Sequence, residues 1–314
     1  MKRSGGTAIT LDELRSGGKA TVARTLAELE RRPDSPEVLA LLDAAYGAPS
    51  GFTIGVTGPP GVGKSTLLGV LIAAWRRRGL KLGVIAVDPS SKRSGGALLG
   101  DRLRLLTDPE DEGVFVRSMA ARDRLGGLAE ITVSAMVVMR AVYDLVLIET
   151  VGVGQSETDV AGAADTVVFC VQPGSGDSLQ FMKAGIVEIP HVAVVTKAEL
   201  GTPASRALAD LKGALSLAEA EADWKIAALQ VSAQARRGLD DLIAAVESHQ
   251  AYLRTAGRLA AQRQAQAQGW LSEAVRARFG REGLKRAGGL SLAPGESPFR
   301  RLAEVSAELA ARCG

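Results

Sequence analysis

The sequence predicts an α/β fold with a mainly parallel sheet flanked by helices, an N-terminal helical segment and a C-terminal helical extension. Three observations support this expectation. Apolar runs rich in β-branched residues alternate with helix-forming segments through the middle of the chain. These runs lack polar–apolar alternation, which is typical of strands that are buried on both faces. A glycine-rich turn stands between the first run and the helix that follows it, as in sheets that bind ligands at their strand ends.

The elements follow from apolar periodicity and from turn residues. Helix-spaced apolar residues over 10–46, with a break at Pro33 to Pro36, predict the N-terminal helices. We expect strands at 52–57, 82–87, 114–117, 145–148, 166–171, 192–196 and 228–232. We expect the intervening helices at 64–78, 128–142, 178–188, 204–219 and 239–247. Strands that alternate with helices in this way favour parallel pairing.

The pattern changes at about residue 248. Residues 250–282 are rich in Ala, Gln and Arg and predict one long helix, which a linker at 287–298 joins to a last helix over 299–312. The long polar helix either adds a packing layer or forms an oligomer arm. We therefore divide the chain into an N-terminal helical segment (1–47), a central α/β domain (48–248) and a C-terminal helical extension (249–314), expected to be a dimerisation arm.

The composition argues against several classes of protein. The chain has 314 residues, with 38 Lys and Arg against 35 Asp and Glu, and this net charge of +3 is too small to indicate nucleic acid or an anionic membrane as partner. No apolar stretch has the length of a membrane span or a signal peptide. Cys170 and Cys313 form no metal or disulfide pattern. We expect a cytoplasmic protein.

The strongest motif is GPPGVGKS at 58–65, which matches G-x-x-x-x-G-K-[ST] in full. Its glycines let backbone N–H groups turn toward phosphate oxygens, and the following helix adds its positive N-terminus. We expect Lys64 to reach the β- and γ-phosphates as a catalytic residue, and the Ser65 hydroxyl to bind Mg²⁺. The expected nucleotide contacts are Gly58, Pro59, Pro60, Gly61, Val62, Gly63, Lys64, Ser65 and Thr66. The motif indicates a P-loop nucleoside triphosphatase or kinase.

Two acidic residues end predicted strands and suit a magnesium site. Asp88 follows the strand at 82–87, and Glu149 follows the strand at 145–148. Ligands of parallel sheets bind at this edge, and Mg²⁺ beside phosphates takes one or two carboxylates. The sequence from Glu149 to Gly152 also resembles the D-x-x-G element of switch GTPases, so the Gly152 N–H is expected to contact the γ-phosphate.

Two further elements indicate a guanine base. Thr196-Lys197-Ala198-Glu199 ends a predicted strand and resembles N/T-K-x-D, whose carboxylate accepts two hydrogen bonds from guanine while its Lys packs over the base. Glu199 is one methylene longer than Asp, so the loop must shift to keep both bonds. After the next strand, Ser232, Ala233 and Gln234 resemble the SA-x element, whose backbone contacts guanine O6. Together they favour GTP and GDP over ATP.

Longer strings resemble one family. They are VDPSSKRSGGALLGDRLRL (87–105), VFVRSMAARDRLGGLAE (114–130), VLIETVGVGQSETDV (146–160) and QPGSGDSLQFMKAGI (172–186). They are similar to the MeaB/ArgK family of GTPases, which includes the methylmalonic aciduria type A protein. The resemblance begins near residue 10, reaches the C-terminus and is densest over 52–200.

The resemblance implies a P-loop GTPase fold of the signal-recognition and metallochaperone class, with a homodimer formed through the C-terminal helices. It implies a G-protein chaperone of an adenosylcobalamin-dependent acyl-CoA mutase, such as methylmalonyl-CoA mutase. Such a chaperone gates cofactor loading and protects the mutase, which in turn stimulates slow GTP hydrolysis.

The resemblance also implies roles for particular residues. Asp88 and Asp101 match acidic positions of the family's first switch, and we expect Asp101 to be a metal-site residue that orients the attacking water. Glu149 matches the carboxylate of the second switch. A third switch, which relays the nucleotide state to the mutase, is matched by Asp177, Gln180 and Lys183.

Three alternatives remain open at this point. The phosphate loop permits a kinase of the arginine-transport type. A nickel or cobalt metallochaperone has a similar GTPase domain but usually needs clustered Cys or His. In this sequence none of the two His (His191, His249) and two Cys is clustered. The third alternative is a GTPase that senses nucleotide on behalf of another client protein.

Overall fold

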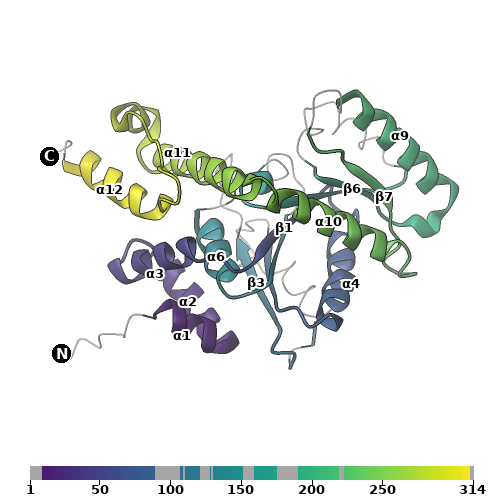
Figure 1. The fold of residues 1–314 in the computed structure, drawn as a ribbon, viewed down its shortest axis with the longest axis horizontal. Helices are drawn as coiled ribbons and strands as arrows, with labels where there is room; N and C mark the ends of the chain where they lie inside the picture. The colour runs from purple at the N-terminus through teal and green to yellow at the C-terminus, as the bar shows by residue number, and fades with distance from the viewer. Residues whose placement is uncertain are drawn as a thin grey trace, which may run out of the picture.

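The computed structural model describes residues 9–88, 107–108, 110–120, 128, 130–150, 159–174, 190–218 and 223–311. Its centre is a seven-stranded parallel sheet in the order β3-β2-β4-β1-β5-β6-β7 (Figure 1). The strands are β1 (Phe52–Thr57), β2 (Leu82–Asp88), β3 (Val114–Ala120), β4 (Leu145–Glu149), β5 (Thr166–Val171), β6 (Val192–Val195) and β7 (Ala227–Gln230). The predicted fold class is confirmed, and the predicted helix at 178–188 lies outside the described residues.

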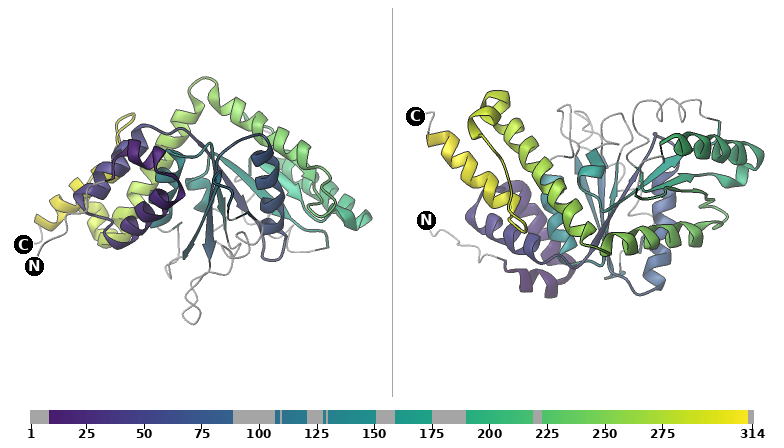
Figure 2. Two further views of the ribbon diagram at one scale, coloured as in Figure 1. Left: turned by 90° about the horizontal axis from the view of Figure 1, so that it is seen from below. Right: turned by 45° about the horizontal axis from the view of Figure 1, so that its top comes forward.

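Helices cover both faces of the sheet (Figure 2). On one face, α4 (Lys64–Arg77) and α10 (Leu239–Arg254) pack against alternate residues of the central strands. On the other face lie α6 (Glu130–Arg140) and, at the β6–β7 end, α9 (Thr202–Ala218). Because both faces are covered, β1, β4, β5 and β6 are buried along their whole length, and Glu149 is the only charged residue in these four strands.

The N-terminal segment forms α1 (Leu11–Ser16), α2 (Gly18–Arg31) and α3 (Pro36–Gly47), which pack on α6. Thr10 and Glu13 form a capping box that starts α1. The predicted break before Pro36 is present, with Ser35 as the N-cap of α3. A second break at Gly17 was not expected from the periodicity.

The predicted bounds of the C-terminal helices are wrong. The helix expected to end at residue 247 continues as α10 to Arg254, and the next helix, α11, spans Arg258–Ala287. Ala256 (φ 52°) and Gly257 (φ 71°) adopt left-handed conformations that end one helix and start the other. The predicted boundary at residue 248 therefore falls inside a helix. The last helix, α12, spans Pro298–Ala311.

The C-terminal extension packs on its own chain. Residues of α11 and α12 share an apolar cluster, and α12 lies beside α3 (Figures 1 and 2). The rings of Tyr46 and Phe299 meet edge to face at 6.4 Å, and Asp43 forms an ion pair with Arg300 at 2.8 Å. One face of the extension is thus used within the chain. In the described part of the chain, no helix has the length and apolarity required to cross a membrane.

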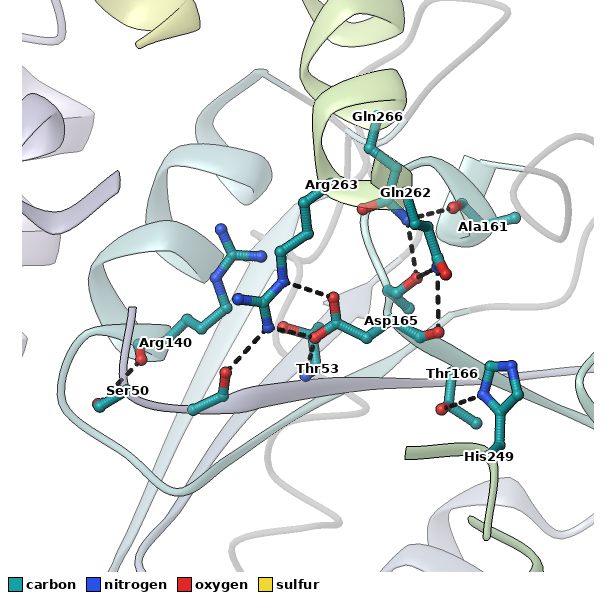
Figure 3. A network of polar contacts seen from close by, with 12 residues as sticks. Ser50, Thr53, Arg140, Ala161, Asp165, Thr166, His249, Gln262, Arg263 and Gln266 are labelled. Carbon is teal, nitrogen blue, oxygen red and sulfur yellow. Dashed lines mark hydrogen bonds and ion pairs between the residues drawn. The ribbon is translucent and has the colours of Figure 1, made fainter. Parts of the chain in front are cut away.

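A buried carboxylate joins this extension to the sheet (Figure 3). Asp165 is fully buried and follows the short 3₁₀-helix η1 (Val160–Gly162). Its Oδ2 accepts the Thr53 N–H at 2.7 Å, and Arg263 of α11 donates to Oδ1 and Oδ2 at 2.8 and 2.7 Å. Gln262 and Gln266, on the same helix, donate to backbone carbonyls between residues 161 and 165.

Both histidines lie in an aromatic cluster near the start of β5. The imidazole rings of His191 and His249 stack at 4.1 Å between centroids, and Trp224 packs against His249. Val167 N–H donates to His191 Nδ1 at 2.9 Å, and Thr166 Oγ1 lies 2.8 Å from His249 Nδ1. Burial lowers the pKa of His191 to about 4 and that of His249 to about 3. Both side chains are therefore neutral at pH 7.

We expect the free energy of unfolding to fall as the pH is lowered from 6.5 to about 4. In that window the unfolded chain binds protons at imidazoles of ordinary pKa, 6.5, while the folded chain does not. The loss should be on the order of 3 kcal/mol for each of the two histidines. Urea unfolding at several pH values measures it. The double variant His191→Asn/His249→Asn removes both histidines of the chain and should show a flatter profile, whereas an unchanged slope would contradict the assignment.

Candidate functional site

The loop with the phosphate-binding motif connects β1 to α4 at the carboxyl edge of the sheet. Gly58 (φ 136°) passes so close to β5 that a Cβ atom there would lie 2.2 Å from the Cys170 carbonyl oxygen. Gly61 (φ 74°) and Gly63 (φ 101°) are left-handed, and a Cβ on either would meet open space. The chain turns tightly at these glycines just before the start of α4, which is the backbone geometry of a phosphate-binding loop.

Lys64 lies inside this loop. Its side chain is only 6% exposed, and its Nζ donates to the carbonyl oxygens of Gly58 at 2.6 Å and Pro59 at 3.0 Å. The loop thus concentrates positive charge from the ammonium group and from the N-terminus of α4. Phosphate oxygens are the ligands that such a site attracts.

The predicted metal-site residues Ser65 and Glu149 are in contact. Ser65 Oγ donates to Glu149 Oε1 at 2.7 Å, and the Glu149 side chain is 1% exposed at the end of β4. Next to them, the hydroxyls of Thr57 and Thr150 are hydrogen-bonded at 2.8 Å. Hydroxyl and carboxylate oxygens are the ligands that Mg²⁺ takes, together with water and substrate phosphates. These residues fit a magnesium ion.

Several predicted residues lie partly or wholly outside the described part of the chain. Asp88 ends β2, whose neighbour β4 pairs Glu149 with Ala86, so the Asp88 backbone lies at the same edge of the sheet. Its side chain is not among the described ones. The remaining predicted residues that lie outside the described ranges are Asp101, Gly152, Asp177, Gln180 and Lys183.

The first predicted base element is held against the phosphate loop. Thr196 Oγ1 lies 2.7 Å from the Val62 carbonyl oxygen and 3.0 Å from that of Val171. Lys197 is left-handed (φ 54°) and donates through Nζ to Gly61 O at 3.0 Å and Gln172 Oε1 at 2.7 Å. The base element and the phosphate loop therefore form one continuous surface.

The two predicted base elements also contact each other. Ala198 begins the 3₁₀-helix η3 (Ala198–Leu200), and its N–H donates to the Val231 carbonyl at 3.2 Å. The pKa of Glu199 is lowered, first by a hydrogen bond from the Ser232 side chain and then by one from the backbone N–H of Glu199 itself. The exposed Glu199 carboxylate is thus ionised at neutral pH, which suits an acceptor of two N–H groups. Ala233 and Gln234 lie in the turn that follows Ser232.

Two residues of the site were not singled out from the sequence. The Gln172 side-chain oxygen accepts a hydrogen bond from the Lys197 ammonium group. Arg237 donates to the Ala198 carbonyl at 3.0 Å, and its backbone pairs with that of Ser232. Gln172 belongs to one of the strings that resemble the family, but Arg237 follows no pattern that could have identified it. Cys170, expected to be an inert core residue, is fully buried, and burial raises the pKa of its thiol to about 12.

Comparison with known proteins gives a consistent result. Residues 21–285 match the family described as "Methylmalonyl Co-A mutase-associated GTPase MeaB". A putative GTPase of Pyrococcus abyssi is 39% identical, over 79% of this chain and 78% of the relative. The mitochondrial methylmalonic aciduria type A homolog of Mus musculus is 38% identical, over 72% of this chain and 55% of the relative.

A solved structure has the same fold. A protein described as an LAO/AO transport system kinase superposes with a TM-score of 0.67 and 28% identity, over 98% of this chain and 99% of that one. The similarity extends over the helical segments at both ends as well as over the sheet.

Proposed function

Because the chain belongs to the MeaB family of methylmalonyl-CoA mutase-associated GTPases, we propose that it is the G-protein chaperone of an adenosylcobalamin-dependent acyl-CoA mutase. In this role it gates cofactor loading and protects the mutase from inactivation. The observation that carries the proposal is the family match over residues 21–285. The name of the mouse relative, a methylmalonic aciduria type A homolog, supports the same client chemistry.

The described residues support a division of labour on the nucleotide. Lys64 and the N–H groups at the start of α4 neutralise and position the phosphates, since phosphoryl transfer depends mainly on positioning and charge. Ser65 and Glu149, joined by Asp88 and Asp101, would hold Mg²⁺, which supplies positive charge to the phosphates when bound. Lys197 and Glu199 are proposed to orient the base, and Asp101 the attacking water.

Coupling to the mutase is assigned to residues beyond the nucleotide. We assign this relay to Asp177, Gln180 and Lys183, and the γ-phosphate contact to Gly152. Formation of a homodimer through α11 and α12 is part of the same proposal. The face of these helices that packs on α3 is used within the chain, so a partner would meet the opposite face.

The first test is GTP turnover, with ATP as control, measured alone and with each purified cobalamin-dependent acyl-CoA mutase of the host. One mutase should raise GTP hydrolysis at least about tenfold and leave ATP hydrolysis unchanged, because a partner that orders the switches completes the active site. Absence of stimulation by every mutase, with GDP still bound, would overturn the chaperone role and leave a GTPase with another client. Equal use of ATP would favour the kinase alternative.

A second prediction concerns guanine selectivity. In Glu199→Gln an amide replaces the carboxylate, so one of the two acceptors for guanine N–H groups becomes a donor. GTP affinity should fall about 10–100-fold. The affinity for XTP should rise, because its base carries an oxygen in place of the amino group of guanine. Competition binding measures both. Glu199→Asp is the matched control and should keep the preference for GTP, whereas unchanged GTP affinity in Glu199→Gln would remove Glu199 from the base site.

A third prediction concerns the metal. In wild type, Mg²⁺ should strengthen GTP binding and EDTA should abolish hydrolysis. Ser65→Ala should bind GTP about as well as wild type in EDTA but lose the gain from Mg²⁺, because the hydroxyl ligand is gone. Ser50→Ala, whose hydroxyl bonds the Arg140 carbonyl far from the loop, is the control and should keep the gain. If Ser65→Ala lost GTP affinity equally in EDTA, Ser65 would act on the phosphates and not on the metal.

A further inference from the structure

Where the C-terminal extension meets the sheet, a charged side chain is buried with one of its N–H groups lacking a partner among the described residues. Arg140 ends α6 and is only 3% exposed. Within the described residues, its Nε has no hydrogen-bond partner, and Figure 3 shows its guanidinium beside that of Arg263 with no contact drawn from it. A guanidinium carries five N–H donors, and leaving such a group unpaired inside a protein is costly.

The charges around Arg140 do not balance. Asp165 is the carboxylate that acts on Arg140, but its two oxygens already accept the Thr53 N–H and both donors of Arg263. Tyr46 supplies no negative charge, because burial raises the pKa of its phenol. Burial lowers the pKa of Arg140 to about 10, so its guanidinium is still protonated at neutral pH. Among the described residues, two arginines and one aspartate leave one positive charge uncompensated.

A small cavity opens beside this charge. It has a volume of about 30 Å³, and its polar lining comprises Tyr46, Arg140, Arg263 and Gln266. The rings of Trp270 and Phe299 form part of its apolar wall. A single water needs roughly 10–15 Å³ of such volume, so the cavity has room for a small ion. Apolar walls lower the local dielectric constant and strengthen attraction between an ion and the guanidinium.

We propose that this cavity binds a small monovalent anion, of the halide class, against the Arg140 guanidinium. One negative charge balances the one uncompensated positive charge of the cluster. The cavity has room for chloride or bromide, whereas the double charge of sulfate would exceed the single positive charge to be balanced. The lining comes from α3, α6, η1, α11 and α12, so the anion would fasten the C-terminal extension to the core of the sheet.

The test is anion-dependent stability of the full chain, dialysed into gluconate. Thermal unfolding is followed while chloride replaces gluconate at constant ionic strength. Chloride should raise the melting temperature by a few degrees with a saturable dependence, because a ligand that binds only the folded state stabilises it. Sulfate should produce at most a continuous, non-saturating rise through its exclusion from the protein surface.

Two variants and an anomalous diffraction experiment test whether the anion binds at Arg140. Arg140→Met should abolish the saturable response and leave GTP hydrolysis unchanged, while Arg300→Met, which removes an exposed arginine of α12, should keep it. If Arg140→Met fails to fold, crystals of the wild type grown in bromide decide, because bromide should give an anomalous peak at the Arg140 guanidinium. No saturable chloride effect together with no bromide peak would overturn the proposal and leave water as the solvation of Arg140.

Discussion

The arrangement of this chain depends on the ion pair and the hydrogen bonds that surround the buried Asp165 carboxylate. A fully buried charge is tolerated only when hydrogen bonds and an opposite charge surround it, and Asp165 obtains both from distant segments. Thr53 belongs to the start of β1, and Arg263 belongs to the C-terminal extension. The extension is therefore held at the amino edge of the sheet. The carboxyl edge, where the nucleotide elements lie, is left uncovered by this attachment.

At that carboxyl edge, the geometry follows from strand order. β1 lies between β4 and β5, and β6 and β7 continue outward on the β5 side. The phosphate loop after β1 consequently lies beside β4, where Ser65 contacts Glu149, and beside β5, where Gly58 passes close to Cys170. The base elements stand one and two strands farther along. In the binding mode proposed above, the triphosphate-to-base direction would run across the strand ends from β4 toward β7.

The sequence was informative where local motif and strand topology coincide. The glycine pattern at 58–65 and the acidic end of the fourth strand predicted a common magnesium site for Ser65 and Glu149, because parallel strands end at a common edge. These two side chains are in contact. Long-range polar pairs escaped prediction. Asp165 and Arg263 are far apart in the chain and follow no spacing rule, so only the folded chain reveals their ion pair. The break between the two helices was predicted at 248–249 and not at Ala256 and Gly257, because both flanking segments have strong helical character.

The Thr196 hydroxyl, which faces the Val62 and Val171 carbonyls together, has a thermodynamic consequence. This hydroxyl connects the loop after β6, which carries the first base element, to the phosphate loop and to the end of β5 before a ligand binds. Part of the conformational entropy of these loops is therefore lost during folding instead of on binding, which favours affinity. In the proposed binding mode, a nucleotide would meet two loops that are already linked.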